Sequence, residues 1–350
     1  MNTLLSPFQE FWKKGDKLLL LLCLLASVYG VALIFSATRY NGNNRAVITQ
    51  CVAILLGAVI YILCTFIDFQ LFVEKNWKLV FGVSVLFILL LLTPLGTDHD
   101  AGNLNWLDIP GFPMEIQPNE IDKLPFILLL ALLITKIQSQ GRDISSIPSV
   151  LQIGGYTAFM LGLIAAVCGD MGMCVVYTFI FATMAWSAGV KLRWFVLAIG
   201  AVVIGFAVLW IFVLPNTAAW NSVYFIKRIR VIFDHSFEPL GVGLQQTRSL
   251  LAIGSGQIFG KGYLQGIMTH STTGALPARH TDFIFAVCGE ELGMVGCLLL
   301  LLLLSLIILR CIWVARNASS PFHAYVSMGM AGMLLIQVAA NVGMCLFVFP

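Results

Sequence analysis

Charged residues are scarce in this sequence. Asp, Glu, Lys and Arg together make up 11% of the 350 residues, less than half of the roughly 25% that is usual in soluble domains. The formal net charge is only +3, too small to hold a polyanion such as a nucleic acid. Hydrophobic residues account for 59% of the chain before its 31 Gly are counted. These proportions exclude a soluble globule, a nucleic-acid-binding protein and a disordered regulator, and they indicate a polytopic membrane protein.

Patterns typical of disulfide frameworks and metal sites are also lacking. None of the nine Cys forms a CxxC pair, and nearly all lie inside apolar runs, so neither a disulfide framework nor a zinc site is predicted. The five His are scattered without ligand spacing, and we expect no metal site built on them. The first apolar run is not followed by a small-residue cleavage site, so we expect it to be a retained span.

Long uncharged runs, by contrast, are abundant. A helix of about 20 apolar residues crosses a bilayer core, and nine segments of the chain approach this length. The predicted spans are 18–38, 46–67, 79–97, 116–135, 146–169, 171–190, 194–215, 292–309 with the residues before it, and 322–350. Asp170 is the only charge between the fifth and sixth of them, which predicts either a tight hairpin or a polar break there. We therefore expect an all-α polytopic membrane protein.

The distribution of Lys and Arg predicts the orientation of these spans. With the N-terminus in the cytoplasm, eleven Lys and Arg fall in the inner connections and three in the short outer ones, as the positive-inside rule requires. Residues 216–281 then form a large extracytoplasmic loop before the eighth span. A second outer segment, 98–123, is rich in acids and contains Trp106, which is most simply an interfacial aromatic residue.

The outer loop contains a Gly-rich stretch, 241–266, with seven Gly in 26 residues. Its spacing matches neither the P-loop nor the dinucleotide-binding pattern. Two interpretations remain open at this point. The backbone N–H groups and Lys261 could meet an anion, or the loop could be purely structural and tucked against the helices.

Charges inside or beside membrane spans are costly and therefore suggest function. Asp282 opens the eighth span, on a helical face that continues through Ala286, Gly289 and Gly293 and would allow close approach. Helix capping is the alternative role for Asp282. Glu290 and Glu291 follow two turns later, and we expect them to have a structural or supporting role.

Two further charged features lie at the outer ends of spans. Glu120 and Lys123 have the spacing of an i, i+3 ion pair, for which we favour a structural role over substrate contact. Asp170 could cap the sixth span or bind a cation inside the bundle, and the sequence does not decide between these roles.

Several motifs resemble one family. LPARHTDFIFAVCGEELGMVG (276–296) resembles the LPxxHTDFIFAVxxEELGxxG signature of the shape, elongation, division and sporulation (SEDS) proteins, RodA and FtsW. The other matches, in the family's order, are SAT at 36–38, IQPNEIDK at 116–123 for QPSExxK, GSGQIFGKG at 254–262 for GSGGLxGKG, and NVGM at 341–344 for NIGM.

The resemblance implies a peptidoglycan glycosyltransferase that polymerises lipid II, an undecaprenyl-pyrophosphate-linked substrate, outside the bacterial cytoplasmic membrane for elongation, division or sporulation. It implies a class B penicillin-binding protein as partner, besides membrane lipids, and no nucleic acid. Asp282 matches the family's essential acid, Glu120 and Lys123 its buried ion pair, Trp106 the Trp of GxxRWL, and Asp170 the Asp of QPDLGT.

The chain also departs from the family pattern. Where the family has Arg before the Trp, this chain has Asn105, and where the family has QPDLGT, this chain has CGDMGM at 168–173. In the outer loop, Arg248-Ser249 replaces the family's Gln-Ser, and Gln257 replaces the second Gly of GSGG. At such positions we expect altered substrate preference or weakened activity. The family continues past Pro350 with a tenth helix, so residues 1–350 are expected to form one SEDS-like membrane domain with about nine helices of ten.

Our mechanistic hypothesis assigns Asp282 as the general base for the acceptor sugar hydroxyl. Partial desolvation would favour this role by raising the pKa of its carboxyl group. Cations would stabilise the departing lipid pyrophosphate, chiefly Arg279 and Lys261, with Arg228 as a third candidate. We expect His280 and Trp106 to bind substrate as well. A divalent cation could assist, but the sequence requires no cofactor.

Two alternatives stay open. One is a flippase or transporter of the same lipid-linked precursor. The other is a non-catalytic scaffold for the penicillin-binding protein. The clustering of unusual charges on the outer side favours chemistry at the outer face.

Overall fold

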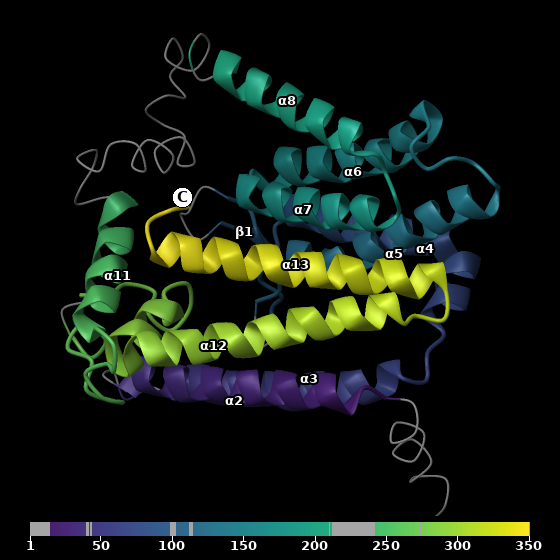
Figure 1. Ribbon diagram of the computed structural model, residues 1–350. Helices are drawn as coiled ribbons and strands as arrows, with labels where there is room; N and C mark the ends of the chain where they lie inside the picture. The colour runs from purple at the N-terminus through teal and green to yellow at the C-terminus, as the bar shows by residue number, and fades with distance from the viewer. Residues whose placement is uncertain are drawn as a thin grey trace, which may run out of the picture. The chain divides into compact units, whose positions relative to one another are not determined.

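The computed structural model describes residues 15–39, 42, 44–98, 103–111, 115–209, 211, 242–272 and 275–349. This described part of the chain contains ten α-helices and one short hairpin of two-residue strands (Figure 1). The elements are α2 (Lys17–Thr38), α3 (Arg45–Cys64), α4 (Phe69–Leu89) with the 3-10 turn η2 (Leu90–Leu92), β1 (Gly96–Thr97), β2 (Trp106–Leu107), α5 (Pro118–Ser139), α6 (Ile147–Cys168), α7 (Met171–Ser187), α8 (Leu192–Val208), α11 (Val242–Gly256), α12 (Ile284–Arg316) and α13 (Pro321–Cys345).

Each of the nine predicted spans corresponds to one of these helices, and the tenth helix, α11, lies within the predicted outer loop. Six helices are long and apolar enough to cross a membrane, namely α2, α3, α4 with η2, α6, α12 and α13. The apolar helices α7 and α8 are shorter, and α5 carries charged residues in its first two turns and Lys136 in its last turn. Helices α3 and α8 bury no residue against the rest of the protein, as expected of helices whose apolar side chains face lipid. The expectation of an all-α polytopic membrane protein is confirmed.

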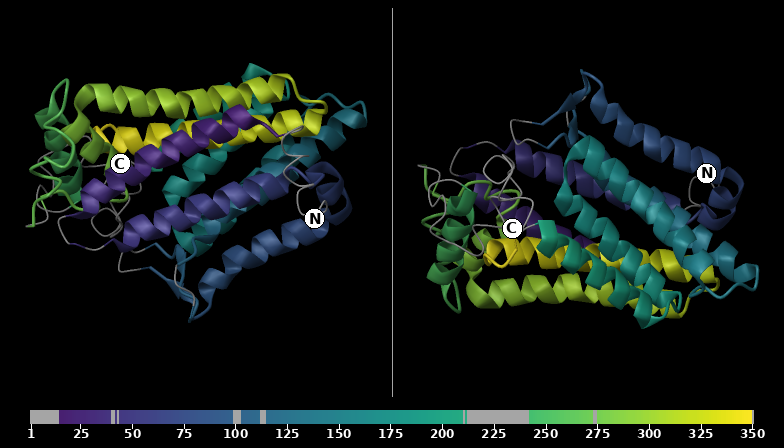
Figure 2. Two further views of the ribbon diagram at one scale, coloured as in Figure 1. Left: turned by 90° about the horizontal axis from the view of Figure 1, so that it is seen from below. Right: turned by 90° about the horizontal axis from the view of Figure 1, so that it is seen from above.

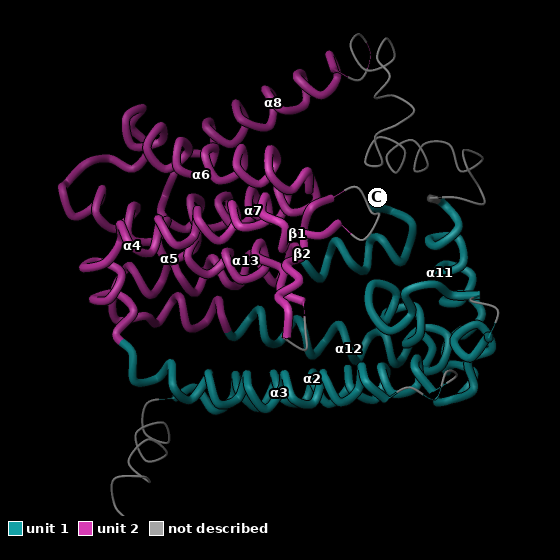
Figure 3. The backbone as a smooth tube through the Cα atoms, turned by 180° about the vertical axis from the view of Figure 1, so that it is seen from behind, with its two compact units in different colours: residues 1–67, 221–310, 337–350 teal, residues 68–220, 311–336 magenta. Residues whose placement is uncertain are grey.

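The described helices divide into two compact units (Figure 3). Unit 2 comprises 68–220 and 311–336. Within it, α4 to α7 pack against one another around a core that includes Phe126, Tyr177 and Ile134. The ring centroids of Phe126 and Tyr177 lie 4.8 Å apart. The hairpin β1–β2 sits in this unit, with Gly96 opposite Leu107.

Unit 1 comprises 1–67, 221–310 and 337–350. Helices α2 and α3 pack side by side, and a second core joins α2, α11, α12 and the end of α13 through residues such as Leu33, Ala252, Val287 and Cys345. Helix α11 and the segment after it gather around the N-terminal end of α12 (Figures 1 and 2). The predicted outer loop is therefore not irregular throughout, because its residues 242–256 form a helix that packs on α12.

The hairpin predicted at Asp170 is confirmed. Helix α6 ends at Gly169, whose φ of +66° suits a left-handed terminator. Asp170 then caps α7, since its side chain accepts a hydrogen bond from the main-chain N–H of Met173 at 3.0 Å. The capping role that the sequence left open is thus present in the structure.

Candidate functional site

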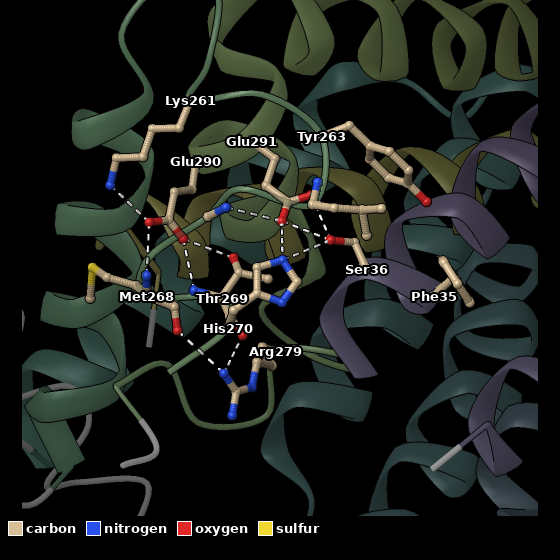
Figure 4. Close-up of polar contacts among 12 residues, drawn as sticks. Phe35, Ser36, Lys261, Tyr263, Met268, Thr269, His270, Arg279, Glu290 and Glu291 are labelled. Carbon is tan, nitrogen blue, oxygen red and sulfur yellow. Dashed lines mark hydrogen bonds and ion pairs between the residues drawn. The ribbon is translucent and has the colours of Figure 1, made fainter. Parts of the chain in front are cut away.

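Two adjacent carboxylates in the second turn of α12 are the centre of a dense polar cluster (Figure 4). The side chain of Glu290 is fully buried and accepts hydrogen bonds from the main-chain N–H groups of Met268 (2.9 Å) and Thr269 (2.8 Å). The Thr269 hydroxyl donates to it at 2.8 Å, and Lys261 Nζ lies 2.9 Å away. Four donors therefore satisfy both oxygens of this carboxylate.

Glu291 is buried to the same degree and is bound by a different set of donors. Ser36 Oγ, from the end of α2, lies 2.7 Å from its carboxylate, and His270 Nε2 lies 2.9 Å away. The main-chain N–H groups of Leu264 and Gly266 donate at 3.2 and 3.4 Å. A buried charge is tolerated only when it is paired or hydrogen-bonded, and both acids meet this condition. Together they fix residues 261–270 and the end of α2 onto α12.

Tyr263 adds a further link between this segment and α2. Its hydroxyl donates to the main-chain oxygen of Ala32 at 2.8 Å. Desolvation and the nearby Glu291 carboxylate raise the pKa of the Tyr263 hydroxyl above its ordinary value, so the group keeps its proton and remains a donor.

The Gly-rich stretch packs where α12 is broken. Gly293 has a non-helical backbone, with φ +66° and ψ −163°, which releases main-chain groups from the helical ladder. Residues of the Gly-rich stretch form hydrogen bonds with these released main-chain groups. The N–H groups of Lys261 and Gly262 donate to the carbonyl oxygens of Glu290 and Glu291, both at 3.0 Å, and the N–H of Met294 donates to Gln257 O at 2.9 Å. Irregular backbone at a membrane span is stable when neighbouring segments satisfy it in this way.

This arrangement decides between the two interpretations of the stretch for its described residues. Its N–H groups at 261, 262, 264 and 266 already bind groups of α12, and Lys261 pairs with Glu290. The geometry therefore favours a structural loop whose anionic partners are the chain's own carboxylates.

Close backbone contact explains why Gly is required here, and it yields a prediction. Gly260 has φ +78°, and a Cβ at this position would overlap with the carbonyl oxygen of Glu291. We expect Gly260→Ala to lower the free energy of unfolding by about 2 kcal/mol or more, since the strained φ and the overlap add. Gly254→Ala is the matched control, because a Cβ at Gly254 in α11 meets nothing within 4 Å. Equal melting temperatures for the two variants in detergent would contradict this explanation.

Asp282 lies just before α12 and is exposed. Within the described residues its carboxylate has no hydrogen-bond or ion-pair partner, so it caps no helix there. The predicted partial desolvation is wrong for the described structure, in which the side chain is exposed. The predicted small-residue face is used for packing: Ala286 is buried, and Gly289 lies directly against Ile253 of α11.

The predicted cations differ in their surroundings. The Arg279 side chain donates to the main-chain oxygens of Met268 (3.3 Å), Thr269 and Ser271 (2.9 Å) and is 3% exposed. This geometry favours a role in holding the segment over direct contact with pyrophosphate. His280 is exposed beside Asp282. Lys261, paired with Glu290, is partly exposed, and Arg228 lies outside the described residues.

The remaining predicted residues belong to unit 2. Lys123 Nζ lies 2.6 Å from Glu120 Oε2, with Lys123 almost fully buried and Glu120 partly exposed, so the predicted i, i+3 ion pair is present. Asp170 also accepts a hydrogen bond from Asn105 at 2.8 Å. Trp106 lies in β2 with its side chain exposed.

Sequence reasoning missed several polar residues that the structure places at these clusters. Ser36, Thr269 and His270 bind the two glutamates. In unit 2, Asp122 is buried and accepts a hydrogen bond from Ser84 at 2.5 Å. The one available signal was the doubled acid Glu290–Glu291 within an apolar segment, which requires donors from elsewhere in the chain.

Comparisons with known proteins agree with this picture. The sequence model of the FtsW/RodA/SpoVE cell cycle protein family matches residues 16–350. The chain is 31% identical over 347 residues to the peptidoglycan glycosyltransferase MrdB of Escherichia coli K12, covering 98% of this chain and 87% of MrdB. It is 28% identical to the probable peptidoglycan glycosyltransferase FtsW of Trichlorobacter lovleyi, covering 100% of this chain and 88% of that protein.

Solved structures resemble the chain as well. A chain from a structure described as a peptidoglycan synthase complex that coordinates polymerization and crosslinking superposes with a TM-score of 0.73 at 26% identity, over 96% of this chain and 88% of that one. The rod shape determining protein RodA of Thermus thermophilus shares the fold, with a TM-score of 0.63 at 24% identity over 94% and 84% of the two chains. From residue 16 to residue 350, then, this chain belongs to the FtsW/RodA/SpoVE family of cell cycle proteins.

Proposed function

We propose that this chain polymerises lipid II into glycan strands at the outer face of the bacterial cytoplasmic membrane, with Asp282 as the general base. The chain is a peptidoglycan glycosyltransferase by family and by the names of relatives that it matches over almost their whole length. The observation that carries the catalytic assignment is the exposed Asp282 carboxylate, which has no partner among the described residues and follows a segment that is hydrogen-bonded to α12.

In the proposed reaction Asp282 accepts the proton of the acceptor sugar hydroxyl. The hydroxyl oxygen forms a bond to the anomeric carbon of the donor sugar, and the bond from that carbon to the lipid pyrophosphate oxygen breaks. A positioned general base typically contributes about 10² to 10⁴ in rate. Because the Asp282 side chain has no partner within the described residues, it can approach a substrate hydroxyl without first breaking an internal contact.

The leaving pyrophosphate requires positive charge. We propose that Arg228 supplies it from the outer loop and that the exposed His280 donates a hydrogen bond to the pyrophosphate. Lys261 is held by Glu290 and has a supporting role. Arg279 supports the site by donating hydrogen bonds to main-chain oxygens within residues 268–271. The described residues contain no group of three or more His, Cys, Asp and Glu that could hold a metal ion.

Location and partner follow from the same function. The chain is a multi-pass membrane protein, and we propose that its N-terminus is cytoplasmic because this orientation places eleven Lys and Arg on the inner side. A class B penicillin-binding protein is the proposed partner. Support comes from the likeness to a chain of a peptidoglycan synthase complex.

One reconstitution distinguishes the proposal from its alternatives. The purified chain is placed in liposomes with lipid II, with and without a class B penicillin-binding protein, and both glycan product and lipid movement between leaflets are measured. Polymerisation predicts glycan strands. Lipid movement without glycan would indicate a flippase, and neither product nor movement would indicate a scaffold.

A further inference from the structure

The main-chain oxygen of Asp282 is bound by two side chains of α13. Asn341 Nδ2 donates to it at 2.9 Å, and Cys345 Sγ lies 3.6 Å away. Residues four apart lie on the same face of a helix, so both groups reach the carbonyl from one face of α13. All three residues belong to unit 1.

This carbonyl needs an outside partner because of where Asp282 lies. Residues 277–283 are turns, and α12 begins only at Ile284. The N–H groups of Ala286 and Val287 both donate to Phe283 O, while those of Thr281 and Phe283 donate to Ala278 O. The hydrogen bonds within the turn therefore leave the Asp282 oxygen to α13.

The end of α13 is itself well anchored. Ser249 Oγ of α11 donates to Cys345 O at 2.9 Å, and Gln246 Nε2 donates to Phe349 O at 2.7 Å. Asn341 thus connects a fixed helix end to a residue whose own side chain has no partner within the described residues.

We infer that Asn341 is a positioning residue for Asp282. It does not touch substrate; its amide fixes the main chain of Asp282 and so aims the carboxylate. The inference rests on the proposed function of Asp282 as general base. Misplacing a catalytic group by about 1 Å can cost up to about 10² in rate.

The test compares three variants of the full chain in the lipid II polymerisation assay. Asn341→Ala is expected to lower kcat about tenfold with KM unchanged, and Asn341→Gln, which keeps the donor, is expected to restore part of the loss. Asn317→Ala is the matched control, because Asn317 Nδ2 likewise donates to a main-chain oxygen, that of Trp313 at 2.8 Å, and both residues belong to unit 2. Hydrogen exchange at residues 278–284 should rise in Asn341→Ala and not in Asn317→Ala.

The outcomes separate this inference from the function on which it rests. If the unsubstituted chain makes glycan and Asp282→Asn does not, while Asn341→Ala behaves as Asn317→Ala in both rate and exchange, the inference fails and the proposed function stands. A raised KM with unchanged kcat in Asn341→Ala would also overturn it, since that result indicates substrate contact. If the unsubstituted chain makes no glycan, the proposed function fails and the inference fails with it.

Discussion

Asp282→Asn is expected to reduce glycan-strand synthesis by at least about a hundredfold, because an amide cannot accept the proton of the acceptor hydroxyl. The substitution keeps the size of the side chain and removes no contact within the described residues, since the carboxylate is exposed and unpaired there. Folding should therefore be unaffected. The measurement is the initial rate of polymer formation from lipid II by the purified variant, with melting temperature measured alongside.

Asp108→Asn is a suitable control for this variant. Asp108 is an exposed carboxylate of the predicted outer segment, and we expect its loss to leave the rate unchanged. If Asp282→Asn and Asp108→Asn polymerise lipid II equally well, Asp282 is not the base.

Glu290→Ala is expected to destabilise the protein by about 3–5 kcal/mol, the range seen when one partner of a buried ion pair is removed. The substitution would leave the Lys261 ammonium and three donors from Met268 and Thr269 without their acceptor. We expect a fall in melting temperature of several degrees. Polymerisation should fall as well, because residues 261–270 lose their anchor on α12.

A double-mutant cycle tests the cause of this effect. If the ion pair dominates, Lys261→Met combined with Glu290→Gln should cost less than the sum of the two single changes, with a coupling of about 1–3 kcal/mol. Glu74→Gln serves as the surface control, since Glu74 is exposed and accepts a hydrogen bond from Gln70 Nε2 at 3.0 Å. If the Glu290→Ala variant has the same melting temperature as the unsubstituted chain, the buried carboxylate is dispensable for stability.

The membrane helices could be predicted from the sequence because each is a local property of about 20 consecutive residues. Local chemistry also identified the hairpin at Asp170 and the ion pair of Glu120 and Lys123, which needs only i, i+3 spacing. Helix α11 was missed, because its Gly content suggested an irregular loop. That Gly content instead permits close packing on α12, as Gly256 shows: a Cβ there would overlap with the carbonyl oxygen of Gly289.

The hydrogen-bond partners of the buried glutamates could not be predicted, because they come from distant parts of the sequence. Ser36 and Glu291 are 255 residues apart, and no local pattern joins them. Arg279 was assigned to substrate by its charge and its place beside Asp282, yet its side chain turns inward to main-chain oxygens. A sequence shows where a charge lies along the chain, whereas only packing shows whether that charge is free to meet a ligand.

The most direct test of Asp282 as base, and not as a substrate-binding group, is to measure lipid II affinity and turnover on the same Asp282→Asn protein. A general base acts in the transition state, so the variant should bind lipid II with unchanged affinity and yet polymerise it at least about a hundredfold more slowly even at saturating lipid II. An affinity that falls in step with the rate, with polymerisation recovered at high lipid II, would contradict the assignment.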